Sequence, residues 1–265
     1  MLLSGRKGVI LGVANKRSIA WAIARAAREH GAELALTYAN DRFKEGVTEL
    51  GDSIGVKHYF PCDVASDAEI ARLAADLKGA LGRIDFLVHA VAFAKKEELA
   101  GAFHETSREG YHLTQDISSF SLIALCRALK PMLERQGIGG SGGEERTTSV
   151  LTLTYLGGQR VVPNYNVMGV AKAALEASVR YLAADLGASG IRVNAVSAGP
   201  IKTLSAAGVN NFSSLLDQMP ERAPLRKNVT QEEVADASVF LLSEMARGIT
   251  GEVLFVDAGF HVMGV

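Results

Sequence analysis

The sequence lacks the residues that mark several specialised protein classes. Its only cysteines, Cys62 and Cys126, lie far apart and outside any CxxC pair. A disulfide framework or a cysteine-rich metal site is therefore not expected, and both thiols are predicted to lie buried in a protein of the reducing cytoplasm. The six histidines show no short ligand spacing, so we expect no metal site.

Long apolar runs and an excess of either charge are also missing. No stretch reaches the ~18 apolar residues of a membrane-spanning helix, and no basic region precedes an apolar core at the start of the chain, so neither a membrane partner nor a signal peptide is expected. The 28 Lys and Arg residues nearly balance the 29 Asp and Glu residues, which leaves a formal charge of −1. Without a basic excess, nucleic acid is not an expected partner.

What the sequence does contain is a regular alternation of short β-branched runs with longer amphipathic segments. Predicted strands cover Gly8–Leu11, Glu33–Tyr38, Val56–Phe60, Ile84–His89, Ser149–Thr154, Arg192–Ser197 and Glu252–Val256. Predicted helices cover Ile19–His30, Asp41–Ser53, Asp67–Leu81, Ser107–Leu133, Tyr165–Leu186 and Gln231–Ser243. This order predicts an α/β protein in which residues 1–265 form a single-domain, Rossmann-type doubly wound parallel sheet of about seven strands, with helices on both faces.

Glycine is abundant, with 27 residues, and its placement is uneven. Five glycines fall in one low-complexity segment, Arg135–Ser149. We predict that residues 135–149 form a flexible surface insertion between a helix and a strand. A tolerated insertion is favoured over a partner-binding loop.

The segment after the first predicted strand has features of a phosphate-binding turn. Gly12 ends the strand, and a helix begins near Ser18 and Ile19. A glycine allows the backbone to approach a pyrophosphate, and the helix N-terminus offers free N–H groups and a positive dipole end. The spacing is weak evidence by itself, and a tight turn without a ligand is the alternative.

Two further strand ends could border a dinucleotide. Asp63 and Val64 follow the third predicted strand, where an adenine could rest, although Asp63 could equally cap the next helix. The small residues Ala90, Val91 and Ala92 follow the fourth, where a ribose could cross the switch point of a doubly wound sheet.

Three residues, Tyr155, Tyr165 and Lys172, carry the catalytic argument. Tyr165 and Lys172 are seven residues apart, which places them on one face of a helix. A nearby ammonium favours the phenolate of a tyrosine and orients a hydroxyl network, and the phenol can hydrogen-bond a substrate carbonyl as negative charge builds on its oxygen. An arbitrary pair at this spacing would more often be packing residues, so the surrounding motifs decide.

Those motifs make the sequence resemble the bacterial enoyl-acyl-carrier-protein reductases of the FabI type, in the short-chain dehydrogenase/reductase superfamily. The resemblance runs from Leu3 to Phe260. Its most specific parts are Gly12–Ala20, Tyr155-Leu156-Gly157, Pro163–Gly169, Ala171-Lys172-Ala173 and Ser197–Ile201. The Tyr-x6-Lys spacing separates this branch from the more common Tyr-x3-Lys reductases.

The resemblance implies a role for each matching residue. Tyr165 would hydrogen-bond the thioester carbonyl and stabilise the enolate, Lys172 would bind the nicotinamide ribose, and Tyr155 would line the acyl pocket. Met168 and Phe212 would also belong to the substrate pocket, although Met168 taken alone is more typical of a helix core. The residues implied to contact the cofactor are Gly12, Ala14, Ser18, Ile19, Asp63, Val64, Ala90, Val91, Ala92, Lys172, Ile201 and Thr203.

The resemblance also implies the reaction and the assembly. Hydride would pass from NADH to the β-carbon of a trans-2-enoyl thioester on acyl carrier protein, within cytoplasmic fatty-acid synthesis. Residues 200–219 would form a substrate-binding segment that closes over the substrate. The family usually forms a homotetramer, and the apolar residues Val253–Val265 would suit an interface.

Some features depart from the family pattern or leave alternatives open. The usual Ser-Ile-Gly after the fourth strand is Ala90-Val91-Ala92 here, and the methyl of Ala92 narrows the floor beside the nicotinamide. The second predicted strand has no acidic residue at its tip, and Arg42 could tolerate a 2′-phosphate, so NADH is favoured and NADPH is possible. A different short-chain carbonyl reductase and a non-catalytic dinucleotide-binding protein are the alternative functions. Tyrosine at position 155 and Gly169 where a Tyr-x3-Lys lysine would stand argue against the first.

Overall fold

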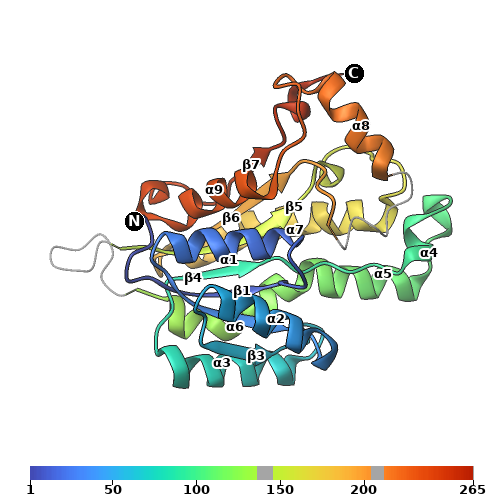
Figure 1. Ribbon diagram of the computed structural model, residues 1–265. Coiled ribbons are helices and arrows are strands. Elements are labelled where there is room, and N and C mark those ends of the chain that lie inside the picture. The colour runs from blue at the N-terminus through green and yellow to red at the C-terminus, as the bar shows by residue number, and fades with distance from the viewer. Residues whose placement is uncertain (136–145, 204–211, 265) are drawn as a thin grey trace.

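The computed structural model describes residues 1–135, 146–203 and 212–264, and within them seven strands form one parallel sheet (Figure 1). The strand order is β3-β2-β1-β4-β5-β6-β7, and every neighbouring pair is parallel. The strands are β1 (Lys7–Leu11), β2 (Glu33–Tyr38), β3 (His58–Pro61), β4 (Phe86–His89), β5 (Thr148–Thr154), β6 (Ile191–Ala198) and β7 (Val253–Val256). The predicted fold class is confirmed, and each observed strand overlaps a predicted one.

Helices cover both faces of the sheet because its strands present apolar side chains in both directions. In β1, Ile10 belongs to one buried cluster, whereas Val9 and Leu11 belong to the other. The first cluster is completed by α1 (Ile19–Glu29), α2 (Asp41–Ser53) and α9 (Gln231–Leu242). The second is completed by α3 (Asp67–Leu81), α6 (Ser121–Leu133) and α7 (Asn166–Gly187). This two-sided burial is the arrangement that a doubly wound parallel sheet requires.

The long helix predicted over Ser107–Leu133 is interrupted in the structure. It begins as α5 (Arg108–Gln115), widens into a π-helical turn over Asp116–Phe120 and continues as α6. Ser118 explains the interruption, because its Oγ accepts from the N–H of Phe93 at 2.9 Å and donates to the carbonyl of Phe93 at 3.0 Å. The π turn therefore attaches this helix to the loop that follows β4.

The remaining elements of the described residues were not predicted. Besides α4 (Lys96–Leu99) and α8 (Phe212–Arg222), 3-10 turns occur at Phe103–Glu105, Leu156–Gly158, Glu244–Ala246 and Phe260–Val262. Residues 204–211 of the predicted 200–219 segment lie outside the described residues. None of the helices in the described ranges has the length and apolarity needed to cross a membrane.

The predicted insertion 135–149 overlaps structured residues at both ends. Arg135 is buried, and its guanidinium pairs with the carboxylate of Asp85 at 2.6 Å. At the other end, Thr148 already begins β5. Residues 136–145 lie outside the described residues, so the surface insertion stays a prediction for that part.

Candidate active site

The centre of the sheet, where strand order reverses between β1 and β4, depends on Gly12. Its φ of 101° is left-handed, and a Cβ built there would lie 2.1 Å from the carbonyl oxygen of Ala90. The backbone after β1 thus lies directly against the backbone after β4. The sequence argument explained Gly12 by the approach of a phosphate, whereas the structure shows that closure of this switch point also requires glycine.

The turn that follows is closed by Ser18. The Oγ of Ser18 accepts from the N–H groups of Ala14 at 3.0 Å and Asn15 at 2.9 Å, and it donates to the carbonyl of Asn15 at 2.7 Å. The hydroxyl proton of Ser18 is therefore used inside the turn and is not free for a ligand. The first turn of α1, which begins at Ile19, contains no acidic residue, so its N-terminal amides fit an anionic phosphate.

The other strand ends contribute one exposed carboxylate and a row of small residues. Asp63 is exposed, and its Oδ1 accepts from the N–H of Ala65 at 3.0 Å. The alternative role for Asp63 as a helix cap is excluded, since the cap of α3 is Ser66. Val64 is buried in the core beside α3. The residues Ala90, Val91 and Ala92 are all partly exposed after β4, which suits a flat group lying across the strand ends.

Tyr165 is positioned by two unusual backbone conformations. The sequence predicted that Tyr165 lies within the helix, whereas the structure shows that it is the N-cap of α7. Its neighbours Asn164 and Asn166 have φ angles of 61° and 34°. Asparagine tolerates this left-handed region better than most residues, so the Asn-Tyr-Asn order permits a sharp turn into the helix. Local strain of this kind is often found at functional sites.

Tyr165 and Tyr155 form an aromatic pair, with ring centroids 5.0 Å apart and an interplanar angle of 71°. Burial raises the pKa of Tyr165 above its ordinary value, and the neighbouring Tyr155 adds to the effect. Burial, followed by the charge of Asp257, raises the pKa of Tyr155 to about 12. The expectation that a lysine would favour the phenolate is wrong for this structure, because desolvation dominates. Tyr165 is a neutral phenol that can donate a hydrogen bond.

Lys172 lies buried on α7, and its Nζ donates to the carbonyl of Leu153 at 2.8 Å. Burial lowers the pKa of Lys172 to about 8, and the carboxylate of Glu176 opposes this effect. An ammonium has three donors, and Leu153 takes only one. Lys172 can therefore donate to further hydroxyl groups and fits the sugar of a dinucleotide.

An apolar cluster surrounds Tyr165 on the remaining side. Met168 is buried there together with Leu99, and the partly buried Ala92 and Tyr165 pack against the same cluster. The structure thus brings Ala92, Tyr165 and Met168 together in one cluster. Phe212 begins α8, but its side chain lies outside the described residues.

The cofactor residues predicted after β6 lie on a separate segment. Ile201 packs against two apolar clusters, one of them beside α8, and Thr203 donates its N–H to the carbonyl of Ile201 at 2.8 Å. These contacts place both residues beyond the carboxyl end of β6.

Sequence reasoning missed His89, which lies fully buried in β4. Its Nδ1 is 2.8 Å from the Oγ1 of Thr152, and its Nε2 is 2.8 Å from the Oγ of Ser121. Burial and the charge of Lys172 lower the pKa of His89 to about 3, so the ring is neutral. The network ties β4 to β5 and α6 beside the candidate site. A polar residue in an otherwise apolar strand was the available signal. The described residues contain no group of three or more His, Cys, Asp or Glu side chains that could hold a metal ion.

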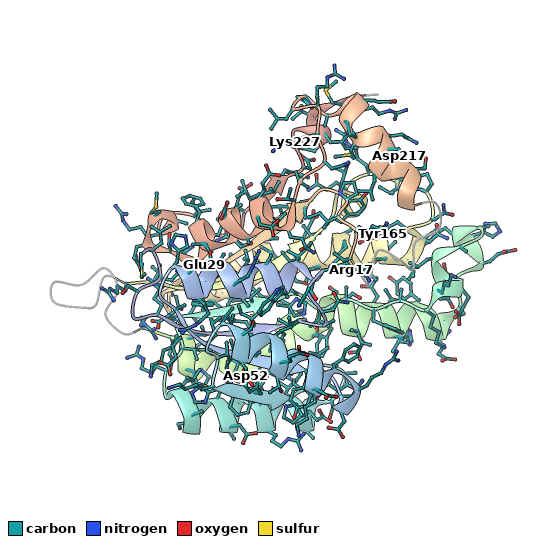
Figure 2. All side chains as sticks on the ribbon, in the orientation of Figure 1. Arg17, Glu29, Asp52, Tyr165, Asp217 and Lys227 are labelled. Atoms are coloured by element: carbon teal, nitrogen blue, oxygen red, sulfur yellow. The ribbon has the colours of Figure 1, made fainter. Side chains whose placement is uncertain are left out.

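Figure 2 labels Tyr165 at the start of α7 and Arg17 just before α1, which places both ahead of a helix N-terminus.

A family model described as Enoyl-(Acyl carrier protein) reductase matches residues 12–261. The chain belongs to this family. It is 52% identical over 265 residues to an NADH-dependent enoyl-acyl-carrier-protein reductase, FabI, of Bacillus cereus, with 99% of each chain covered. It is 53% identical over 262 residues to the corresponding Bacillus subtilis protein, covering 98% of this chain and 97% of that one.

A solved structure supports the same relationship. The Bacillus cereus enoyl-acyl-carrier-protein reductase, crystallised with NADP+ and an indole naphthyridinone, superimposes with a TM-score of 0.94 at 51% identity. The superposition covers 100% of this chain and 99% of that chain. The family assignment and the sheet topology therefore agree over the whole length of the protein.

Proposed function

We propose that the chain is an NADH-dependent enoyl-acyl-carrier-protein reductase that reduces trans-2-enoyl thioesters in fatty-acid synthesis. The observation that carries the proposal is that Tyr165 and Lys172 are both held at the end of β5. Lys172 bonds to Leu153 in that strand, and Tyr165 packs on Tyr155, which follows it. This pairing occurs in a chain 52% identical to an NADH-dependent reductase.

Lys172 and the turn before α1 would hold the cofactor. When bound, the reduced nicotinamide supplies the hydride that adds to the β-carbon of the substrate. The ammonium of Lys172 donates to the ribose hydroxyls with the protons that Leu153 does not take. The remaining contacts fall to Gly12, Ala14, the backbone of Ser18, Ile19, Asp63, Val64, Ala90, Val91, Ala92, Ile201 and Thr203.

Tyr165 is the residue that acts on the substrate oxygen. Its neutral phenol donates a hydrogen bond to the thioester carbonyl, and this bond strengthens as the oxygen takes on the negative charge of an enolate. The raised pKa keeps the donor proton on Tyr165 at neutral pH. Tyr155 packs edge-on against Tyr165 and lines the acyl pocket with Met168.

The cofactor preference rests on the end of β2. Ala39 and Asn40 follow that strand, and the Oδ1 of Asn40 is already used to accept from the N–H of Arg42 at 3.1 Å. The exposed Arg42 keeps NADPH possible, whereas the relatives are NADH-dependent enzymes. Steady-state kinetics with each nucleotide would give the larger kcat/KM with NADH, and a larger value with NADPH would contradict the preference.

The function is tested by following NADH consumption with a crotonyl thioester and with a longer trans-2-enoyl thioester. We expect turnover of both by protein whose circular dichroism shows it to be folded. Folded protein that reduces neither thioester would contradict the proposal. Tight NADH binding without turnover would favour the alternative of a non-catalytic dinucleotide-binding protein.

Carrier binding would involve basic residues near the pocket. Lys202 and Arg226 are both exposed, and Lys202 follows Ile201 directly. We expect Lys202→Glu to raise the KM for an enoyl thioester on acyl carrier protein while leaving the KM for a small enoyl thioester unchanged, because only the carrier presents an acidic surface. Equal effects on both substrates would exclude carrier docking at Lys202.

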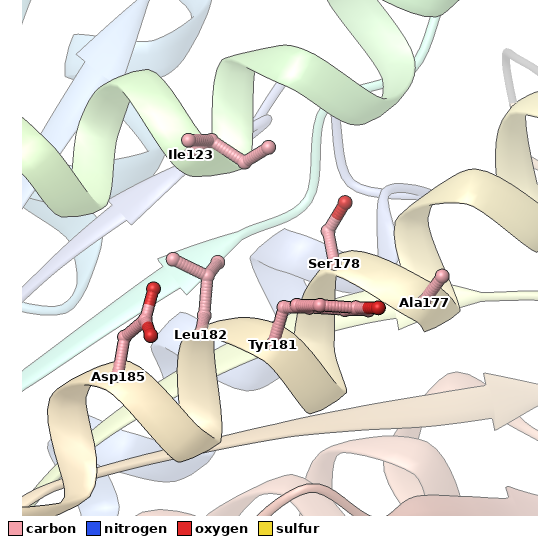
Figure 3. Close-up of a pocket in the computed structure, with 6 residues that line it drawn as sticks. All are labelled: Ile123, Ala177, Ser178, Tyr181, Leu182 and Asp185. Carbon is pink, nitrogen blue, oxygen red and sulfur yellow. The ribbon is translucent and has the colours of Figure 1, made fainter.

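A homotetramer belongs to the same proposal. Ile123 on α6 and Tyr181 and Leu182 on α7 line a shallow apolar hollow between the two helices (Figure 3). Tyr181 is 76% exposed and Val262 near the C-terminus is 65% exposed, so both leave apolar surface for a second copy. Light scattering should give the mass of a tetramer, and a monomer would contradict this assembly.

The buried thiols of Cys62 and Cys126 support the proposed cytoplasmic location.

A further inference from the structure

A buried carboxylate lies next to the candidate catalytic residues without a role in the reaction proposed above. Glu176 is only 4% exposed and lies one helical turn beyond Lys172 on α7. Burying an acidic side chain is unfavourable unless its charge is compensated by hydrogen bonds or a nearby cation. The contacts of Glu176 therefore indicate what the carboxylate does.

Glu176 holds both ends of the segment that carries Tyr155. Its Oε1 accepts from the Oγ1 of Thr154 at 2.8 Å, and its Oε2 accepts from the Nε2 of Gln159 at 2.9 Å. Thr154 is the last residue of β5, and Gln159 follows the turn Leu156–Gly158. One side chain of α7 thus fixes the segment on either side of Tyr155.

The turn has little room to move away from α7. A Cβ at Gly158 would lie 3.0 Å from both the Oε1 of Glu176 and the carbonyl carbon of Lys172. A Cβ at Gly169 would lie 2.8 Å from the carbonyl oxygen of Gly157. The glycines allow the turn to lie directly on the helix, and Glu176 bonds to it at that short separation.

Glu176 also acts on the ammonium group of Lys172, whose positive charge is needed for cofactor binding. Glu176 from α7 and His89 from β4 interact electrostatically with Lys172, and the phenols of Tyr155 and Tyr165 belong to the same site. The pKa of His89 falls to about 3 and both phenol pKa values are raised, so these three groups are uncharged at neutral pH. Glu176 is the group whose charge opposes the loss of the Lys172 proton.

A second buried carboxylate near the site, Asp257, has different partners. Asp257, at the end of β7, acts on Tyr155 and accepts from the Nδ1 of His261 at 2.9 Å and from the backbone of Gly259 at 3.0 Å. Its oxygens are therefore committed to the C-terminal segment. Asp257 does not replace Glu176 as the partner of Lys172.

We propose that Glu176 is a positioning residue of the reductase, which holds the turn that carries Tyr155 and supplies the negative charge that keeps Lys172 in its ammonium form for cofactor binding. The proposal rests on the reductase function proposed above. It predicts two separable effects, one on the pH dependence of NADH binding and one on the use of the enoyl substrate.

The charge is tested with Glu176→Gln, which keeps the size of the side chain and an acceptor for Thr154. The Kd for NADH is measured by fluorescence titration between pH 6 and 10, without substrate. Wild-type Kd should rise above about pH 8, and in Glu176→Gln the rise should begin at a lower pH. A shift of about one pH unit would weaken binding about fivefold at pH 8. Glu49→Gln removes an exposed carboxylate on α2 and should follow the wild type. Coinciding profiles for folded Glu176→Gln and wild type would overturn the electrostatic role.

The positioning of the turn is tested with variants that leave the charge in place. Thr154→Val and Gln159→Leu each remove one contact to Glu176 and should raise the KM for the enoyl thioester several-fold without shifting the pH profile of NADH binding. Glu176→Asp keeps the charge on a shorter side chain and should restore the wild-type binding profile. An unchanged KM in both contact variants would overturn the positioning role, even if Glu176→Gln does not fold.

Failure of the reductase function has a different signature. Wild-type protein would then turn over no enoyl thioester, while the NADH binding profiles would still report on Glu176 and Lys172.

Discussion

The edge of one tyrosine ring meets the face of another where Tyr155 packs on Tyr165, with centroids 5.0 Å apart and planes inclined by 71°. Such aromatic pairs contribute about 0.5–1.5 kcal/mol beyond burial alone. The contact restricts both rings, and burial, followed by the neighbouring Tyr155, raises the pKa of Tyr165. The candidate catalytic donor is thus oriented by a ring contact and kept neutral by the same packing.

Replacing Tyr165 with phenylalanine separates the phenol from the ring. Tyr165→Phe keeps the contact with Tyr155 and removes the donor, so kcat should fall about 100-fold or more while the Kd for NADH stays near the wild-type value. Stopped-flow reduction of a crotonyl thioester and NADH fluorescence titration measure the two quantities. Tyr181→Phe, at the exposed hollow of α7, is the matched control and should retain full activity. A kcat within a few-fold of wild type in Tyr165→Phe would exclude the donor role.

The ammonium of Lys172 predicts both the strength and the pH dependence of cofactor binding. Hydrogen bonds from charged groups contribute about 1.5–3 kcal/mol, so Lys172→Met should raise the Kd for NADH at least about tenfold at pH 7. Because the pKa of Lys172 is lowered to about 8, the wild-type ammonium is present below that pH and is lost above it. Calorimetric titration should show wild-type affinity falling from pH 8 to 10 and a flatter profile for Lys172→Met. Parallel profiles for the two proteins would contradict this assignment.

The sheet was predictable because the apolar pattern of each strand and the alternation of strands with helices can be read from neighbouring residues in the sequence. Apolar runs such as Gly8–Leu11 are typical of strands buried on both faces, and their alternation with helices requires parallel crossovers. The π-helical turn at Asp116–Phe120 was not predictable. The sequence on both sides of this turn has an ordinary helical pattern. The turn is held by the hydrogen bond between Ser118 and Phe93, which are 25 residues apart in the chain.

The site was predictable only where the separation of two residues in the sequence indicates their chemical role. Tyr165 and Lys172 follow from their separation and from the surrounding motifs. His89 and Glu176 were missed because each acts through partners that only the folded chain brings together. The pKa of Tyr165 had the wrong predicted direction for a related reason, since a spacing argument gives the proximity of a lysine but not the loss of solvent around the phenol.

Gly12 links cofactor binding to the stability of the fold. Gly12→Ala places a Cβ 2.1 Å from the carbonyl oxygen of Ala90 at a φ of 101°, so it should lower the free energy of unfolding by more than about 1 kcal/mol and weaken NADH binding. Gly79→Ala on α3 is the control, because a Cβ there has no neighbour within 4 Å and alanine favours the helix by up to about 1 kcal/mol. Urea denaturation measures both changes. Equal stability of Gly12→Ala and wild type would contradict the proposed closure of β1 on β4.

The buried ring of His89 predicts how the fold responds to acid. Its folded pKa of about 3 lies below the ordinary value of 6.5, so the unfolded chain binds the extra proton first. The contribution of the neutral ring is fully present above pH 6.5 and is lost progressively as the pH falls toward 3, by up to about 1.4 kcal/mol per pH unit. His89→Gln keeps a donor and an acceptor for Thr152 and Ser121 but does not titrate. Urea denaturation between pH 7 and 4.5 at fixed protein concentration should therefore show a steeper loss of stability for wild type than for His89→Gln, whereas equal slopes would show that His89 is not the group that binds the proton.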